Sequence, residues 1–412
     1  MKAHRGLIVG TLFFFAVPLH RVHGQPGARA EAKAARRQVP NATAAVVGRP
    51  PKVRRVWPDA PEIARIAFRG TLASERDIGK KLTGFASLRA KLEGTTETVL
   101  TVQRPFDVVS NASDRVYVTD GTRNLVLVFD ATARAAKPLG EDGPGHLVLP
   151  MGLAIDGNGN VYIADRGAKR VVVFGRDDAF VRTYGNAELL LNPVDVAVDS
   201  RAGLVYVADS FQHQVLVFKQ SDGALLRRIG RNAGAISSAQ RTAPASASHG
   251  KRAAVAPDAS GHNAPATEPR DVVANRGVGS GEFRYPAFLA VGPNGALYVS
   301  DAMNARVQVF DRDGHFVRQV GQLGDGPGAL ARPKGVAVDS EGHLYVADAA
   351  FNNIQIFDDQ SRLLLAFSQM GRGEGELDLP SGLFIDRNDR IYAADRSNNR
   401  ILIFQYLRAG AH

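Results

Sequence analysis

Residues 333–357 read Pro-Lys-Gly-Val-Ala-Val-Asp-Ser-Glu-Gly-His-Leu-Tyr-Val-Ala-Asp-Ala-Ala-Phe-Asn-Asn-Ile-Gln-Ile-Phe, and this stretch decides the fold. It holds three short runs of β-branched, aliphatic and aromatic residues, which are typical of β-strands. The runs are 335–339, 344–347 and 354–357, and Gly, Asn and Asp mark the turns between them. A fourth run at 363–367 follows, so the stretch predicts a unit of four antiparallel strands.

The same unit occurs six times along the chain. Each copy begins with a proline, has a strand that ends in Tyr-x-x-Asp, and has a phenylalanine nine residues after that aspartate. The prolines recur every 43 to 47 residues, except for one interval of 93 that holds one repeat and an insertion. A period of about 45 residues with four strands per unit is typical of a β-propeller. The sequence therefore predicts an all-β, six-bladed propeller with four-stranded blades. The aspartates are Asp120, Asp165, Asp209, Asp301, Asp348 and Asp395.

The last repeat has no fourth strand, because only eight residues follow Phe404. An alternating segment at residues 64–69 lies before the first repeat and has no partner of its own. We expect this N-terminal strand to complete the last blade, so that both termini close the ring and no sheet edge is left open. Between residues 82 and 92, apolar side chains at helical spacing predict one helix packed on the propeller.

The N-terminal residues 1–24 have the features of a signal peptide. Lys2 and Arg5 precede an apolar run at 7–19 that is too short to span a membrane, and a plausible cleavage point lies before Gln25. We therefore expect a periplasmic or secreted protein. No later segment is apolar over the roughly 18 residues of a spanning helix, so no transmembrane segment is expected in the mature chain.

The formal net charge of +10 is confined to the N-terminal region. Residues 1–55 carry the whole excess, which leaves residues 56–412, and with them the predicted propeller, with no basic excess. Nucleic-acid binding is not expected, because it requires a basic domain. Residues 25–55 are predicted to be a basic, disordered linker, and residues 231–275 a disordered insertion between blades three and four. The chain has no cysteine, which excludes disulfides and thiolate metal sites.

The repeats provide an internal comparison between scaffold and site. The aspartate that recurs in all six units is assigned to the fold, where it is expected to accept backbone N–H groups in a tight turn. Two residues after the proline, three units have glycine, whereas the first and third have Asp107 and Asp195. The first strand of each blade lines the central channel of a propeller, so these carboxylates are expected at the channel mouth. There they are candidate ligands for a divalent cation such as Ca²⁺, or for a basic group.

Lys334 occupies the preceding position of the fifth unit and is a candidate to pair with these carboxylates. The alternative is a polar, water-filled channel mouth without a ligand. Two loop histidines on the same face, His146 and His213, are interpreted as solvated side chains.

Residues 286–310, 333–357 and 380–404 resemble the NHL repeat, which reads approximately P-x-G-V-A-V-D … G-x-L-Y-V-A-D-x-x-N-x-R-V-x-V-F. The resemblance extends over residues 60–407. The arrangement of the repeats is similar to that of exported bacterial six-bladed propellers. It implies a platform that binds protein or RNA, and the family also contains an amidating-pathway lyase. That lyase activity would require channel-facing histidines for zinc, and none of the six expected first strands begins with one.

The leading hypothesis is therefore a non-catalytic binding or scaffold module outside the cytoplasm. Its loops between the second and third strands, and between blades, would recognise a protein or glycan partner. The competing hypothesis is a metal-dependent hydrolase or lyase whose site is the channel mouth. No G-x-S-x-G, H-E-x-x-H or phosphate-binding Gly-rich motif is present, and apart from the candidate cation no cofactor is expected.

Overall fold

A computed structural model describes residues 55–59, 62–79, 99–230 and 276–408. The predicted signal peptide, most of the basic linker, the helix between 82 and 92 and the insertion at 231–275 lie outside these ranges. Within them, no helix has the length and apolar character needed to cross a membrane.

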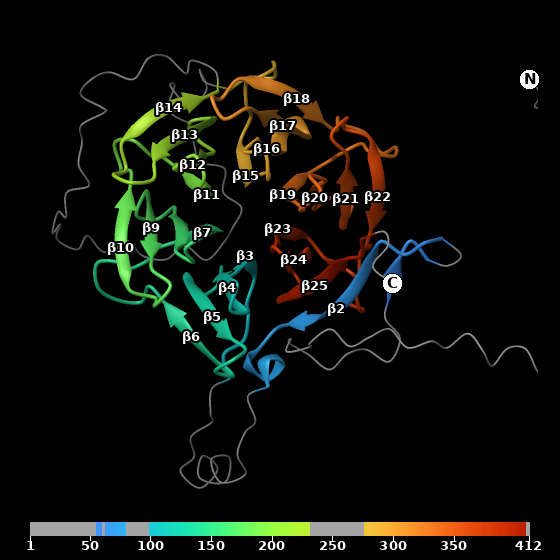
Figure 1. Ribbon diagram of the computed structural model, residues 1–412, viewed down its shortest axis with the longest axis horizontal. Coiled ribbons are helices and arrows are strands. Elements are labelled where there is room, and N and C mark those ends of the chain that lie inside the picture. The colour runs from blue at the N-terminus through green and yellow to red at the C-terminus, as the bar shows by residue number, and fades with distance from the viewer. Residues whose placement is uncertain (1–54, 60–61, 80–98, 231–275, 409–412) are drawn as a thin grey trace, which may run out of the picture. The chain divides into compact units, whose positions relative to one another are not determined.

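Six antiparallel sheets are arranged around a central axis, as predicted (Figure 1). The strands of each blade are called a to d from the axis outward. Blades one to three are β3 (Pro105–Ser110), β4 (Arg115–Asp120), β5 (Leu125–Asp130), β6 (Ala135–Leu139); β7 (Pro150–Ile155), β8 (Val161–Asp165), β9 (Arg170–Phe174), β10 (Phe180–Tyr184); and β11 (Pro193–Asp199), β12 (Leu204–Asp209), β13 (Gln214–Lys219), β14 (Leu225–Ile229). Blades four to six are β15 (Pro286–Val291), β16 (Leu297–Asp301), β17 (Arg306–Phe310), β18 (Phe316–Val320); β19 (Pro333–Val338), β20 (Leu344–Asp348), β21 (Asn353–Phe357), β22 (Leu363–Phe367); and β23 (Pro380–Ile385), β24 (Arg390–Asp395), β25 (Arg400–Tyr406).

The N-terminal strand β2 (Ile66–Leu72) completes blade six by pairing with β25, and Phe68 lies opposite Phe404. This confirms the predicted closure, although the strand begins and ends later than residues 64–69. A further strand, β1 (Val56–Trp57), adds a fifth member outside β2. Sequence reasoning missed β1 because two residues carry no periodicity. Two short 3₁₀ helices, η1 (Glu75–Ile78) and η2 (Ala302–Asn304), are the helical elements of the described chain.

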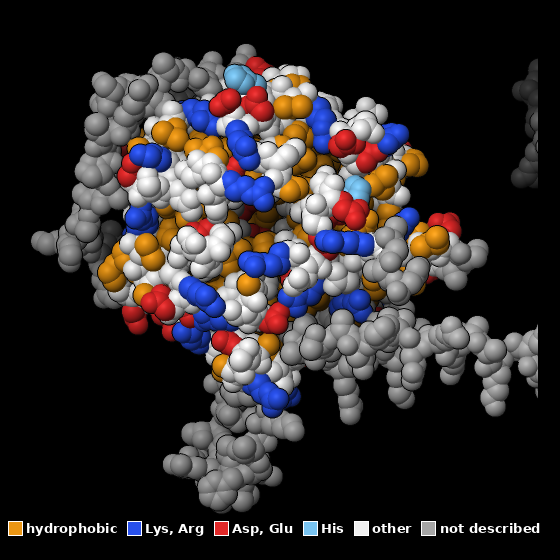
Figure 2. All heavy atoms as spheres, viewed as in Figure 1, with side chains coloured by type: hydrophobic (Ala, Val, Ile, Leu, Met, Phe, Trp, Pro, Cys, Tyr) orange, Lys and Arg blue, Asp and Glu red, His pale blue; other side chains and the backbone are white. Residues whose placement is uncertain are grey.

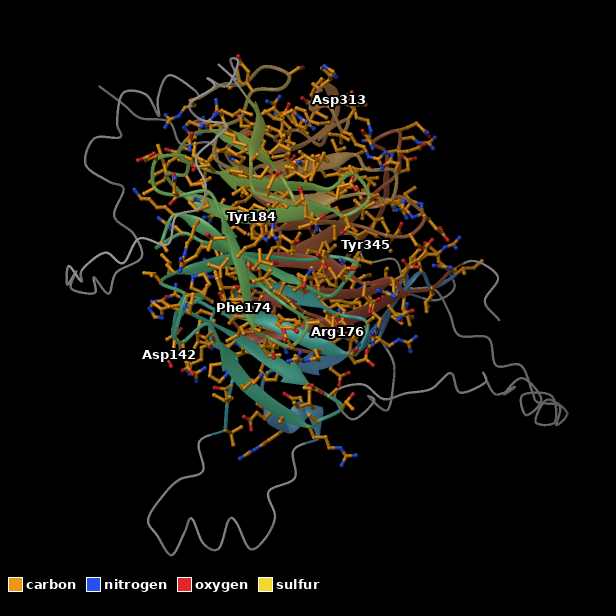
Figure 3. The ribbon with its side chains drawn as sticks, turned by 60° about the vertical axis from the view of Figure 1, so that its left-hand side comes forward. Asp142, Phe174, Arg176, Tyr184, Asp313 and Tyr345 are labelled. Atoms are coloured by element: carbon orange, nitrogen blue, oxygen red, sulfur yellow. The ribbon has the colours of Figure 1, made fainter. Side chains whose placement is uncertain are left out.

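Hydrophobic clusters fill the space between neighbouring blades. Between blades two and three, for example, Tyr162 and Val173 pack against Val196 and Phe218. The phenylalanine that recurs in strand c is at most 4% exposed in all six blades. Apolar faces on both sides of each sheet are therefore covered by neighbours, which is why a single blade would not be stable alone. Figure 3 shows Phe174, Tyr184 and Tyr345 among these side chains.

The aspartate that ends strand b joins two loops on one side of the ring. Asp348 Oδ1 accepts hydrogen bonds from the backbone N–H groups of Ala350 and Phe351 in the b–c turn, at 2.9 and 3.2 Å. Its Oδ2 accepts one from Ala331, at 2.8 Å, in the connection that precedes strand a. This confirms the predicted turn role and adds a second one, because the carboxylate also anchors the d–a connection.

The side of the propeller that carries b–c turns and d–a connections is here called the upper face, and the side with a–b and c–d hairpins the lower face. In Figure 3, Asp142 of a d–a connection and Asp313 of a c–d hairpin lie toward opposite sides. Strand a begins at the upper face with a β-bulge in every blade, where its register with strand b shifts directly after the proline. A bulge leaves a residue unpaired and redirects the chain. In blade one this irregular segment contains Asp107, and in blade three it ends at Asp195.

Candidate functional site

The central channel contains a cavity of about 150 Å³ that is lined by strand a of all six blades. Its only ionisable lining residues are Asp107 and Asp195, and the remaining lining side chains are aliphatic or aromatic. The cavity therefore combines apolar walls with two carboxyl groups. Its lining consists of residues 107–109, 153–155, 195–198, 288–291, 336–338 and 383–385.

Asp107 connects three blades. Its Oδ2 accepts a hydrogen bond from the backbone N–H of Leu153 in blade two, at 2.7 Å, and its own backbone N–H donates to Thr119 Oγ1, at 2.8 Å. Its Oδ1 faces Gly382 of blade six, where a Cβ atom would lie only 1.9 Å away. The side chain is 4% exposed. Asp107 is thus buried between blades.

Asp195 repeats this arrangement two blades further on. Its Oδ2 accepts a hydrogen bond from the backbone N–H of Leu289 in blade four, at 2.7 Å, and its Oδ1 lies against Gly152 of blade two. Asp195 Oδ1 is buried and has no hydrogen-bond partner. In both cases the donor residue, Leu153 or Leu289, stands at the end of the β-bulge of its own blade.

Burial in this cavity disfavours the charged form of both carboxyl groups. It raises the pKa of Asp107 to about 7. Burial and the nearby Asp107 charge together raise the pKa of Asp195 well above its usual range. Two negative charges close together in a low-dielectric cavity repel each other strongly. The cavity therefore favours either proton uptake or a cationic ligand.

A stacked aromatic pair crosses the channel beside Asp107 and Asp195. The ring of Phe106, from blade one, stacks on that of Phe288, from blade four, with centroids 5.0 Å apart. Phe106 and Lys334 occupy the same position of strand a, and residues of that position do not line the cavity. Within the described residues, Lys334 forms no ion pair with either carboxylate. The predicted group of three is thus divided between cavity and upper face.

Lys334 instead belongs to a group of cations at the upper face, here called the upper cationic cluster: Arg104, Arg332, Lys334 and Arg396. Arg104 and Arg332 precede strand a, and Arg396 follows the end of strand b. Burial, together with the Arg332 and Arg396 charges, lowers the pKa of Lys334 to about 8. Burial and the charges of Arg104 and Arg332 also lower the pKa of Arg396. Among the described residues, these four side chains have no carboxylate within ion-pair distance. Sequence reasoning missed the cluster because its members come from three different repeats.

The two loop histidines differ from each other. His213 is fully buried, and its Nδ1 accepts the backbone N–H of Tyr285 at 3.0 Å, so the prediction of a solvated side chain was wrong for this residue. Burial and the charges of Arg276 and Arg284 lower its pKa to about 4. His146 is exposed, as expected, and its Nδ1 lies 2.6 Å from the carbonyl oxygen of Glu141. His213 is therefore part of the link between blades three and four.

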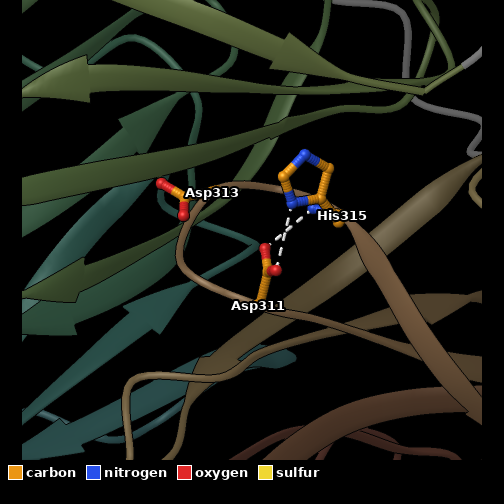
Figure 4. A group of neighbouring side chains, drawn as sticks. All are labelled: Asp311, Asp313 and His315. Atoms are coloured by element: carbon orange, nitrogen blue, oxygen red, sulfur yellow. Dashed lines mark hydrogen bonds and ion pairs between the residues drawn. The ribbon is translucent and has the colours of Figure 1, made fainter.

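Asp311, Asp313 and His315 gather on the c–d hairpin of blade four (Figure 4). Asp311 accepts the backbone N–H of His315 at 2.9 Å and lies 3.1 Å from its Nδ1. The a–b hairpin of blade five has the same pairing between Asp339 and His343. The group thus repeats a hairpin contact of the scaffold, and we assign no metal to it.

Comparisons with known proteins agree with this fold. Residues 147–174 and 190–218 match the NHL repeat, and residues 290–349 match a family described as a 6-bladed beta-propeller. The protein brain tumor of Drosophila melanogaster is 28% identical over 130 residues, which are 31% of this chain and 12% of that relative. The match thus covers only a small part of the relative's length.

Two solved structures are similar to this chain at low identity. A protein of unknown function from Bacteroides thetaiotaomicron VPI-5482 is 14% identical, with a TM-score of 0.51 over 74% of this chain and 70% of that one. A streptogramin B lyase is 13% identical, with a TM-score of 0.48 over 74% of this chain and 94% of that one. At such identity the first likeness shows the fold alone.

Proposed function

We propose that this chain, a six-bladed β-propeller built of NHL repeats, is a binding module that recognises an acidic segment of a partner protein on its upper face. The upper cationic cluster is the observation that carries this proposal. Burial lowers the pKa of Lys334 and of Arg396, and the charges of neighbouring members of the cluster lower both further. A carboxylate-rich ligand would relieve their mutual repulsion and gain from it.

The surroundings of the cluster favour recognition because they are rigid. The strand-b aspartates hold the b–c turns and d–a connections by hydrogen bonds to backbone N–H groups, as Asp348 does for Ala331 and Ala350. Binding groups held in place by a rigid scaffold lose little conformational entropy when a ligand binds. Arginine also matches the planar geometry of a carboxylate with two parallel hydrogen bonds.

The competing hydrolase or lyase hypothesis relied on Asp107 and Asp195 at an open channel mouth. Both carboxylates are buried, and each already accepts a backbone N–H group. These observations favour the binding module. We further propose that it acts outside the cytoplasm, a proposal that rests on the composition of residues 1–24. Mass spectrometry of the mature N-terminus in the native host tests this localisation, and a retained Met1 would contradict it.

The binding proposal is tested by fluorescence anisotropy with the full chain and a labelled peptide of ten glutamates. We expect saturable binding that weakens with added salt, and no binding of a ten-lysine peptide. The double variant Arg104→Glu/Arg332→Glu should weaken binding by at least about 10-fold, because it replaces attraction by repulsion. The variant Arg134→Glu/Arg387→Glu is the matched control: it changes net charge equally at exposed positions in hairpins of the lower face.

Equal weakening in the control would show a non-specific charge effect and overturn the site. The sequence analysis also named a glycan as a possible partner, and competition with polygalacturonate tests this alternative. If the polysaccharide bound at the cluster and the peptide did not, an acidic glycan would replace the protein as ligand.

A further inference from the structure

The channel cavity continues toward the lower face. A second pocket, of about 300 Å³, is formed by hairpin residues of blades one, two and six, and it shares Ile155, Phe384 and Ile385 with the channel cavity. Figure 2 shows the face with the hairpins, where hydrophobic side chains surround a hollow at the centre and Lys and Arg side chains stand around it. The cavity can therefore be entered from this side.

The opposite end of the cavity is closed by the stacked rings of Phe106 and Phe288, which cross the channel from blades one and four. Asp107 and Asp195 lie at this end, only 4% and 2% exposed, and Asp195 Oδ1 has no hydrogen-bond partner. An unpaired, buried carboxylate oxygen is costly, and a protein group or a ligand normally satisfies it.

The walls between entrance and closed end are apolar. Valine, leucine, isoleucine and alanine side chains from all six strands a face the cavity, together with Phe288 and Phe384. A fully hydrated ion would lose its water shell here without finding other oxygen ligands. Ca²⁺ requires six to eight oxygen ligands, whereas the side chains of this cavity offer only two carboxylates. The donor set thus disfavours the calcium ion considered from sequence.

We infer that the channel cavity binds a small primary alkylamine, which enters from the lower face with its ammonium group at Asp107 and Asp195 and its hydrocarbon stem along the apolar walls. An ammonium group donates three hydrogen bonds and carries one positive charge. Transfer of methylene groups from water to aliphatic side chains is favourable and would hold the stem. This site is independent of the proposed upper-face function, because its lining includes no residue of the upper cationic cluster.

The electrostatics of the cavity support this ligand class. Burial raises the pKa of both carboxyl groups, and the nearby Asp107 charge raises that of Asp195 further. A bound cation would stabilise the ionised forms and remove much of the repulsion. The size of the cavity favours a free monoamine over the side chain of a large partner, which would also have to enter through the hairpin pocket.

The test is isothermal titration calorimetry at pH 8 with the full chain and 1-aminopentane. We expect one molecule bound per chain and a dose-dependent rise of Tm. Pentan-1-ol, which has the same stem without the charge, should bind at least 10-fold more weakly, and so should CaCl₂. Asp195→Asn should weaken binding of the amine at least 10-fold, whereas Asp313→Asn, a control on an exposed hairpin, should leave it unchanged.

A second variant guards against misfolding of the aspartate variant. Ala290→Leu adds bulk to the cavity wall without touching either carboxylate and should also abolish binding. Equal binding of pentanol and 1-aminopentane would overturn the inference, and so would calcium binding in preference to the amine, or unchanged amine affinity in Asp195→Asn. Binding of a lysine-containing peptide without binding of 1-aminopentane would show that the ligand is a lysine side chain of a partner, and would overturn the proposal of a free alkylamine.

Discussion

The Oδ1 atom of Asp195 lies against the backbone of Gly152 in the neighbouring blade, so closely that a Cβ atom on Gly152 would be 1.8 Å from it. Asp107 and Gly382 have the same relationship, at 1.9 Å, across the junction of blades six and one. Aspartate in one blade and glycine in the adjacent blade thus form two complementary pairs around the channel. The glycines are needed for the carboxylates to fit.

Gly152→Ala should therefore destabilise the propeller by about 1–3 kcal/mol, because the new methyl group must displace the Asp195 carboxylate from a packed position. Thermal or urea unfolding measures the change. Gly157→Ala is the control, since a Cβ atom there would meet nothing within 4 Å. Equal stability of the two variants would contradict the close approach.

The raised pKa values of Asp107 and Asp195 predict that stability decreases as pH rises. Above the unfolded-state pKa of about 3.9, the folded protein holds protons that the unfolded chain has released. The stabilisation is lost as pH rises through about 7 for Asp107, and at higher pH for Asp195. The slope approaches about 1.4 kcal/mol per pH unit for each carboxyl group that is protonated only in the folded state.

The double variant Asp107→Asn/Asp195→Asn should have a flatter profile between pH 5 and pH 8, because an amide oxygen still accepts the Leu153 and Leu289 N–H groups but does not titrate. Free energies of unfolding in urea at both pH values give the comparison. An unchanged difference between pH 5 and pH 8 would show that these carboxyl groups do not titrate as described.

His213 predicts the opposite pH dependence. Its folded-state pKa of about 4 lies below the usual value of 6.5, so its contribution is complete above pH 6.5 and is lost as pH falls toward 4. The difference corresponds to at most about 3 kcal/mol. His213→Asn, which can still accept the Tyr285 N–H, should reduce this loss of stability in acid. His146→Asn, at the exposed loop histidine, should not; an equal effect of both would refute the assignment.

The closing strand is monitored by the single tryptophan of the chain, Trp57. Its ring lies 5.7 Å from those of both Phe367 and Phe404, so its fluorescence reports on the junction of blades five and six. Phe68→Ala removes a buried ring of β2 and should cost about 3–5 kcal/mol. Ile63→Ala, at a side chain that is 73% exposed, should have little effect.

Because β2 is an integral strand of blade six, fluorescence and far-UV circular dichroism should report the same urea midpoint in the unmodified protein and in Phe68→Ala. A fluorescence transition at clearly lower urea would show that β2 detaches before the ring unfolds.

The architecture could be predicted from the sequence because the same four-stranded unit is repeated along the chain. Six copies of one strand pattern made it recognisable even where a single copy deviates from it. Because the last copy lacks a fourth strand, the N-terminal segment was predicted to supply it. The strand-b aspartates were recognised as scaffold for the same reason, since a residue present in every blade serves what all blades share. By contrast, β1 has only two residues, and nothing in its sequence distinguishes it from a loop.

Only part of the candidate site could be predicted from the sequence. Comparison between repeats identified Asp107, Asp195 and Lys334 as exceptions, but their distance and burial depend on neighbouring blades. The sequence does not show that Phe106 stacks on Phe288 across the channel. It likewise does not indicate that Arg104 and Arg396 lie near Arg332 and Lys334, because tens to hundreds of residues separate these three parts of the chain.

By itself, then, the sequence determined the number of blades, the order of strands within each and the way the ring closes, since these follow from hydrophobic periodicity and turn residues along the chain. Only the tertiary structure decided which exceptional side chains meet. Contacts across the channel join blades that are not adjacent in sequence, and burial there changes the charge that a carboxyl group or a lysine prefers. Those two effects, proximity and loss of water, are properties of the assembled ring and not of any single repeat.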